Sequence, residues 1–417
     1  MTEKELTPES VTTPGDQTPE ENALEKASEI PLRKRLLDLM LVNLKIGSTS
    51  FGAPTAHVAM MEREYVHKHK WVTPQHFLDL LSAANIIPGP NASETCYHVG
   101  YVHAGYPGLL VAGISFILPA IISALILAWV YMRYGALPEM VGLFYFLNPL
   151  VLAIVLDSTF RLAKSSYTNW KQIPLFIAII VAKILGVDEV VILLGAGLVM
   201  IVVHFIQNGF PKNKKTPPSM MLFVLPVVEL IEKYLPTVKN IFLYFLRTGT
   251  VLFGSSMVLF GLIQDDIVNR FGWLSMQQLT DAIAIGQITP GPVLASSTYV
   301  GFLASGLNGT FLDGLKGGLA ATAGVFLPSF VIVAVTAPIV KKMRESELAS
   351  AFLSGVNVAT VALILMVSVT LAQNGVVDIW TALLALGGLA ALIFLKVPPW
   401  VLVLSGLAMG ALRIFVF

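Results

Sequence analysis

The sequence predicts an all-α membrane protein that crosses the bilayer several times and consists of two homologous halves. Of its 417 residues, 55% are hydrophobic and 13% are charged, whereas soluble domains carry about 25% charged residues. A membrane-spanning helix needs about 20 apolar residues. Uncharged runs of that length predict spanning helices at residues 104–132, 317–340 and 348–377, and shorter candidates lie at 140–156, 248–264, 379–395 and 397–412.

Charge and cysteine content exclude several classes of function. The net charge of +1 indicates no acidic partner and argues against nucleic-acid binding. Cys96 is the single cysteine of the sequence, which excludes an internal disulfide and disfavours a cysteine-based metal or redox centre. We therefore expect the lipid bilayer as a partner, and neither a metal nor another cofactor.

Two polar segments divide the chain into domains. Residues 1–30 are acidic and rich in Pro, Thr and Glu, a composition that predicts a disordered tail. The stretch NGFPKNKKTPPS (208–219) marks a polar linker, which we place at residues 208–239. The predicted membrane domains are residues 31–207 and 240–417. The basic cluster LRKR (32–35) favours a cytoplasmic N-terminus.

The two domains are copies of one another. LKIGSTSFG (44–52) aligns with LRTGTVLFG (246–254), and the same shift of 202 residues pairs Trp71 with Trp273 and Asp79 with Asp281. Residues 44–90 show 12 identities in 47 positions, where chance gives about 3. FILP (116–119) also aligns with VFLP (325–328), and LGVDEVVILLG (185–195) with LKVPPWVLVLS (395–405). We interpret this as a tandem duplication.

A Pro-Gly-Pro triplet interrupts each half at the same position. Proline lacks a backbone N–H and breaks helices. Residues 75–87, which precede the first triplet, would span roughly 20 Å as a helix and stop short of crossing a bilayer. A broken or re-entrant helical hairpin fits this length. Such breaks in equivalent places are typical of transporter substrate sites between repeats. The alternative is that each triplet only kinks a packed helix.

The segments NASET (91–95) and VLASST (293–298) follow the two breaks and predict new half-helices. A helix N-terminus offers unpaired N–H groups and partial positive charge, so two converging ends favour an oxyanion. The predicted substrate-binding residues are Lys45, Arg247, Gly52, Gly254, Pro88, Gly89, Pro90, Asn91, Ser93, Pro290, Gly291, Pro292, Ser296 and Ser297.

Lys45 and Arg247 occupy the same repeat position, seven residues before Gly52 and Gly254. An unpaired cation inside a membrane is costly and indicates an ion or substrate pathway, and two of them would offset the charge of a dianion. The alternative is that both side chains extend to the lipid headgroups.

Four further residues are candidates for proton coupling. Glu94 and His98 lie four residues apart on one face of a helix, where they could carry a proton or simply satisfy each other. Asp79 and Asp281 could be helix caps, partners of Lys45 and Arg247, or proton carriers, and we favour the structural roles. The charged stretch EREYVHKHK (62–70) predicts a solvated segment at the membrane surface.

No nucleotide-binding GxxxxGK[ST], HExxH or GxSxG motif occurs in the sequence. An ATP-driven pump or an intramembrane hydrolase is therefore disfavoured. The sequence predicts a secondary transporter and no enzyme.

FGAPTAHVAMMEREYV (51–66), IIPGPNASETCYHVGYVHAGYPGLLVAGISFILPA (86–120) and ITPGPVLASSTYVG (288–301) resemble the motifs of the chromate transporter (CHR) family, in its long-chain, two-domain form. This resemblance implies export of chromate across the cytoplasmic membrane, driven by the proton motive force, as a resistance mechanism. It also implies that the two repeats are inverted relative to one another. Sulfate is the isosteric alternative. Ala53, where the family motif has a glycine, and Glu94, which places a carboxylate beside the anion site, depart from the pattern.

Other readings remain open. A sulfate or other oxyanion permease and an anion channel fit the same features, whereas a membrane chromate reductase lacks residues to hold electrons. The sequence is compatible with an oligomer and does not fix the number of subunits.

Overall fold

The computed structural model describes residues 30–51, 54–85, 87–135, 138–166, 172–208, 235–254, 256–339 and 347–416. Residues 1–29 of the predicted tail lie outside these ranges, and so do residues 209–234 of the predicted linker. The described chain is helical, with two short strands, β1 (Gly89–Pro90) and β2 (Phe253–Gly254). The predicted all-α class is confirmed.

The two halves contribute corresponding elements. The first half consists of α2 (Leu32–Thr49), α3 (Pro54–Met61), the π-helix η1 (Glu62–Lys68), α4 (Pro74–Ala84), β1, α5 (Asn91–Tyr134), α6 (Pro138–Ser166), α7 (Ile173–Ile184) and α8 (Glu189–Asn208). The second half consists of α9 (Val238–Val251), β2, α10 (Val258–Gln264), the π-helix η5 (Asp265–Arg270), α11 (Met276–Ile288), η6 (Val293–Ala295), α12 (Ser296–Gly306), α13 (Phe311–Thr336), η7 (Ala337–Ile339), α15 (Glu347–Gly375), α16 (Ile379–Ile393) and α17 (Pro399–Val416).

Five described helices are long and apolar enough to cross a membrane, which makes the chain a multi-pass membrane protein. The apolar windows lie in α5, α6, α8, α13 and α15, and α7, α16 and α17 are shorter apolar helices. One predicted span is wrong. Residues 248–264 form no continuous helix, because α9 ends at Val251, β2 follows, and α10 begins only at Val258.

A backbone break divides α5 into two helices. Ala104 has φ −145° and ψ 24°, and Gly105 has φ 63°, both outside the helical region. Glycine adopts positive φ without strain, and Pro107 follows directly in the next turn. The short first part of α5 and its long second part therefore correspond to α12 and α13. This confirms a short helix after each Pro-Gly-Pro triplet.

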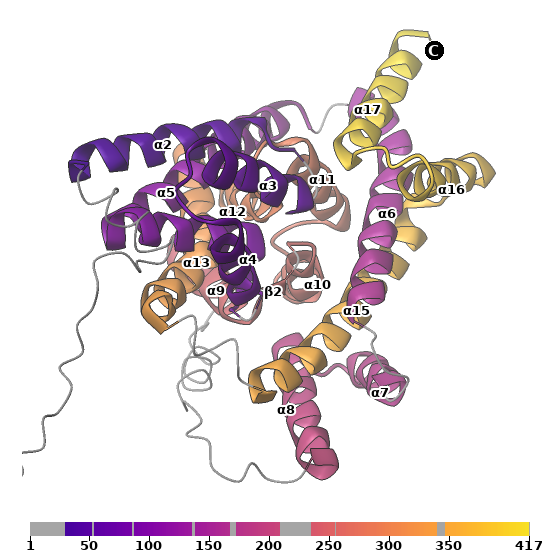
Figure 1. Cartoon of the computed structure of the whole chain (residues 1–417). Coiled ribbons are helices and arrows are strands. Elements are labelled where there is room, and N and C mark those ends of the chain that lie inside the picture. Colours follow the sequence, from indigo (N-terminus) through magenta and orange to yellow (C-terminus); the bar gives the residue numbers. More distant parts are fainter. Residues whose placement is uncertain are drawn as a thin grey trace, which may run out of the picture.

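The helices form two groups in Figure 1. The core group contains α2 to α5 and α9 to α13, and the arm group contains α6 to α8 and α15 to α17. Within the arm group α6 packs against α16 and α17, and α15 packs against α7 and α8. α6 and α15 thus each pack against two helices of the other half, so the halves interleave.

The first helix of each half packs closely against a long helix. A Cβ atom on Gly47 of α2 would lie 2.3 Å from the carbonyl oxygen of Phe116 in α5. A Cβ atom on Gly249 of α9 would lie 2.4 Å from that of Val325 in α13. Such backbone approach is the way small residues join helices within a membrane. The shift of 202 residues relates Gly47 to Gly249, so the packing is repeated along with the sequence.

We predict that Gly249→Ala lowers the thermal stability of the detergent-solubilised protein by the equivalent of about 1–3 kcal/mol, because its methyl group would overlap the α13 backbone. Gly387→Ala in α16 is the matched control, since nothing lies within 4 Å of a Cβ there. Equal melting temperatures for the two variants would contradict this packing.

Candidate functional site

Each Pro-Gly-Pro break is hydrogen-bonded to the other half of the chain. The N–H of Gly89 donates to the carbonyl of Leu252 (2.5 Å), and the N–H of Gly291 donates to the carbonyl of Ser50 (2.8 Å). The 202-residue shift converts one of these contacts into the other. β1 also pairs in parallel with β2, with Gly89 opposite Phe253. The two breaks and the two ends of the first helices therefore form one crossed unit in the core group.

Both central residues of the triplets must be glycine. Gly89 has φ 142° and Gly291 has φ 88°, a conformation that other residues rarely adopt. Space is also lacking at the first break, where a Cβ on Gly89 would lie 2.1 Å from Oε1 of Glu94 and 2.8 Å from Cβ of Ser329. A Cβ on Gly291 would lie 3.1 Å from Cβ of Ala120.

Each break therefore lies against a long helix of the opposite half. Ser329 follows Pro328 in α13, and Ala120 follows Pro119 in α5. These two positions correspond in the alignment of FILP with VFLP. A backbone break is tolerated at membrane depth only where protein or a polar cavity surrounds it, and here the other half provides that surrounding.

The helices that leave the two breaks hold buried polar atoms without a hydrogen-bond partner in the described structure. Most buried polar atoms in proteins are paired, so such a group points to a polar ligand. The atoms belong to the first part of α5 and to α12, and they are Oδ1 of Asn91, Oγ of Ser93, both carboxylate oxygens of Glu94, the hydroxyl of Tyr97, Nε2 of His98, Oγ of Ser296 and Ser297, and the hydroxyl of Tyr299.

The sequence analysis missed Tyr97 and Tyr299. Both are completely buried, and the 202-residue shift pairs them. The ring of Tyr97 stacks on Phe330 of α13 (4.2 Å between ring centroids), and its hydroxyl faces Ser93 and Ser329. Tyr299 makes an edge contact with Tyr131 (5.7 Å between centroids). Extending the repeat comparison beyond the second break would have found the pair.

Glu94 and His98 do not satisfy each other. Glu94 lies in the first turn of α5 and is completely buried, and neither of its carboxylate oxygens has a hydrogen-bond partner. His98 is also buried, and its Nε2 atom has no partner. The reading of these residues as a mutually satisfied pair is therefore wrong.

Lys45 and Arg247 both have carboxylate partners. Nζ of Lys45 lies 2.5 Å from Oε1 of Glu64 in η1. Arg247 pairs with Asp188 and, at 3.5 Å between Nη1 and Oδ2, with Asp266 in η5. The expectation of unpaired membrane cations is corrected, and so is the assignment of Asp79 and Asp281 as their partners. Glu64 and Asp266 are related by the 202-residue shift, which could have identified them.

The surroundings of the two cations differ. Lys45 is about half exposed (48% of its side chain), whereas Arg247 is buried (9%). Burial pushes the pKa of Glu64 up, but its hydrogen bonds to Lys45 and Lys68 outweigh burial and hold the pKa below its usual value. The predicted surface character of residues 62–70 applies to most of them, but Glu64, Tyr65 and Val66 are buried.

Arg247 belongs to an ion-pair network between the core and arm groups. Asp188 and Glu189 at the start of α8 approach Asp266 of η5, and their carboxylate oxygens lie within 4.8 Å of one another. That spacing would suit a metal ion. Each of these carboxylates, however, has a cationic partner, and we assign no metal here. The partners are Lys183 for Glu189 and Asp265, Arg247 for Asp188 and Asp266, and Arg270 for Asp266.

Asp79 and Asp281 are not helix caps. Thr73 and Ser275 cap α4 and α11, six residues before them. Asp281 is buried and accepts a hydrogen bond from Gln277 (2.8 Å), which also pairs with Asn148 of α6. Asp79 accepts the equivalent, longer bond from Gln75 (3.4 Å) near the surface. The cap reading is therefore wrong, and a proton-carrying role stays a prediction.

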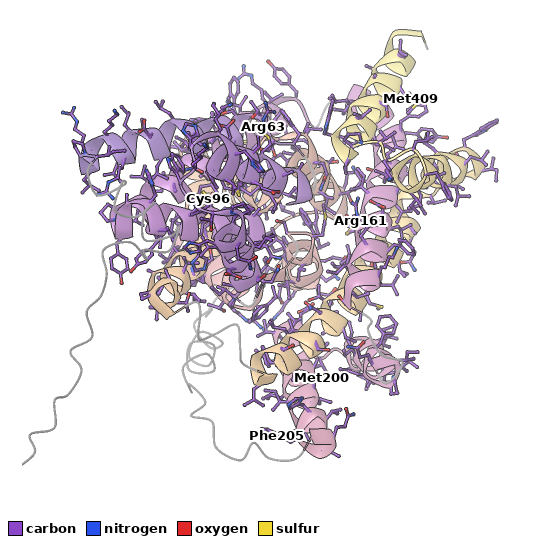
Figure 2. The ribbon with its side chains drawn as sticks, viewed as in Figure 1. Arg63, Cys96, Arg161, Met200, Phe205 and Met409 are labelled. Carbon is purple, nitrogen blue, oxygen red and sulfur yellow. The ribbon has the colours of Figure 1, made fainter. Side chains whose placement is uncertain are left out.

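The remaining predicted residues have clear positions. Pro90 and Gly254 face each other in the β1–β2 pair, and Phe51 bridges to Pro290. Pro292 precedes η6. Gly52 lies outside the described residues. Cys96 lies inside the core group (Figure 2), where its Sγ atom contacts Oδ1 of Asn43 at 3.0 Å.

Several known proteins are similar to this chain in sequence over most of their length. The family model described as "Chromate transporter" matches residues 37–201 and again residues 239–411. A "Probable chromate transport protein" of Synechococcus elongatus is 30% identical over 353 residues, which are 84% of this chain and 87% of that protein. A "Chromate transport protein" of Cupriavidus metallidurans is 29% identical over 378 residues, 90% of this chain and 92% of that protein. One from Pseudomonas aeruginosa is 27% identical over 339 residues, 79% of each.

No solved structure matches the chain. The family model nevertheless covers both halves, and the similar proteins are named as transporters. The chain therefore belongs to the chromate transporter family.

Proposed function

We propose that this protein exports chromate, a tetrahedral dianion, and binds it between the two helix ends that follow the Pro-Gly-Pro breaks. The observation that carries the proposal is the group of buried, unpartnered polar atoms at the starts of α5 and α12. Two helix N-termini supply backbone donors and partial positive charge without a full cation. Asn91, Ser93, Ser296 and Ser297 supply side-chain groups in the first turns of these two helices.

The membrane potential supports the outward direction. Moving one elementary charge across 100 mV is worth about 2.3 kcal/mol, so a dianion that leaves a negatively charged cytoplasm gains about 4.6 kcal/mol per 100 mV. The electrical part of the proton motive force thus favours export, and export of a toxic oxyanion would confer resistance.

Alternating access requires that the site open to one side at a time. We place the movement between the core group, which contains both breaks, and the arm group, which packs beside it (Figure 1). If the repeats are inverted as expected, the inward-open and outward-open states would arise when the two repeats exchange conformations. Sulfate has the same shape and charge as chromate, and the helix ends alone would accept either anion.

We predict that Ser93→Ala and Ser296→Ala each weaken chromate binding by roughly 10- to 150-fold, because a hydrogen bond to a charged group is worth about 1.5–3 kcal/mol. The measurement is the concentration dependence of radiolabelled chromate uptake into everted vesicles. Ser368→Ala is the matched control, since that buried hydroxyl bonds the carbonyl of Ile364 within α15. Unchanged apparent affinity in both site variants would remove the helix ends from the binding site.

We expect chromate uptake into everted vesicles to rise when a potassium diffusion potential makes the lumen positive, because the transported species is negatively charged. Excess sulfate should reduce this uptake if the two anions share the site. Saturable sulfate uptake without chromate uptake would identify a sulfate permease instead. A current that does not saturate with anion concentration would indicate a channel.

The two repeat-related cations should respond differently to neutralisation. Arg247→Gln leaves Asp188 and Asp266 without their buried partner, so we expect a loss of about 3 kcal/mol or more in stability. Lys45→Gln removes a half-exposed pair and should cost about 1 kcal/mol or less. Thermal unfolding in detergent measures both.

Transport by the folded Lys45→Gln protein then tests the prediction that Lys45 contributes charge to substrate binding. Wild-type transport by this variant would exclude that role. Restored stability in Arg247→Gln/Asp188→Asn would confirm that Arg247 acts through its carboxylate partners.

A further inference from the structure

Glu94 is placed where an ionised carboxylate has neither a hydrogen-bond partner nor an ion-pair partner among the described residues, and only the partial positive charge of a helix N-terminus to offset its charge. It is completely buried, both of its oxygens lack hydrogen-bond partners, and it lies against the backbone of Gly89 at the first break. A buried charge without a partner is strongly unfavourable, whereas a neutral carboxylic acid is tolerated. The geometry therefore favours the protonated form while the site is empty.

No described cation is directed at this carboxyl group. On its own helix, Glu94 interacts electrostatically with the phenol of Tyr97, and Ser93 and Ser329 lie beside that phenol. Several charged side chains on the neighbouring helices pair with other groups: Lys45 with Glu64, Arg35 with the carbonyl of His103, Asp79 with Gln75, Arg247 with Asp188 and Asp266, Asp281 with Gln277, and Asp313 with Thr310.

An oxyanion bound at the helix ends increases the free-energy difference between protonated and ionised Glu94. An ionised Glu94 would repel a dianion, whereas a protonated Glu94 can donate its O–H to one of the anion oxygens. Resting on the proposed function, we propose that Glu94 carries one proton together with each oxyanion, so that anion and proton cross the membrane in the same direction.

The second half offers no second proton carrier at this position. Ser296 occupies the position of Glu94 in the second half, and a serine does not titrate. Glu94 therefore contributes one proton for each anion. A dianion and one proton move together as a single net negative charge. The membrane potential drives this complex outward, while an acidic exterior opposes its exit.

The test uses purified protein in liposomes with chromate at alkaline pH, where the anion itself is fully deprotonated. The potential is clamped at zero with potassium and valinomycin, and a trapped dye reports the internal pH. Inward chromate flow through the wild-type protein should acidify the lumen. In Glu94→Gln, whose amide donates permanently, chromate flow should leave the lumenal pH unchanged.

A second readout is the pH dependence of chromate binding. Binding to the wild-type protein should weaken about tenfold for each pH unit above the titration, the slope for one linked proton, because the proton is taken up with the anion. Binding to Glu94→Gln should be independent of pH. Glu62→Gln, an exposed carboxylate in η1, is the matched control and should behave as wild type.

If Glu94→Gln binds chromate but does not transport it, calorimetry replaces the transport assay. The heat of chromate binding, measured in two buffers of different ionisation enthalpy, gives the number of protons taken up on binding. At a pH above the titration of Glu94 in the empty protein, proton uptake that is equal in wild type and Glu94→Gln would overturn the proposal. Lumenal alkalinisation or constant pH during wild-type chromate entry would overturn it as well, while leaving chromate transport intact. Absence of any chromate flow in the wild type would instead refute the proposed function, and the proton coupling with it.

Discussion

The structure depends on one constraint, namely that a backbone N–H inside the hydrocarbon region must find an acceptor within the protein. The two Pro-Gly-Pro breaks expose such donors at Gly89 and Gly291, and each donor is satisfied by the other half of the chain. This crossed arrangement allows two helices to begin inside the protein. Those helix ends, with their buried polar atoms, are what distinguishes the core group from an ordinary helical bundle.

The two halves correspond in their helices but differ in their charged residues. Asp188 and Glu189 link α8 to Arg247 and Lys183, whereas the aligned positions at the start of α17 are Pro398 and Pro399. There the rings of Trp400 in α17 and Phe51, which follows α2, are in contact, with centroids 6.1 Å apart. The start of α8 is therefore joined to the core group by ion pairs, whereas the start of α17 makes an aromatic contact with it.

The sequence was sufficient for the helical class, the duplication and the position of the breaks, because periodic apolar runs, proline and a fixed shift are local signals. It was not sufficient for features that depend on contacts between residues far apart in the sequence. Residues 248–264 have the composition of a spanning helix, yet Phe253 and Gly254 pair with β1. The partners of Lys45 and Arg247 lie on η1, on η5 and directly before α8, so no rule of spacing within one helix would reveal them. The proposed role of Glu94 likewise depends on the lack of a hydrogen-bond or ion-pair partner for its carboxyl group, which a sequence does not reveal.

The crossed hydrogen bonds also bear on how the chain is made. Gly89 is synthesised and enters the membrane well before its acceptor, the carbonyl of Leu252, leaves the ribosome. During that interval the first break has an exposed donor that water or another chain must satisfy. The first half therefore lacks an acceptor for the N–H of Gly89 until the second half has been made. The proposed site can form only after that. Because both copies belong to one polypeptide, each half is always made together with the half that completes its hydrogen bonds.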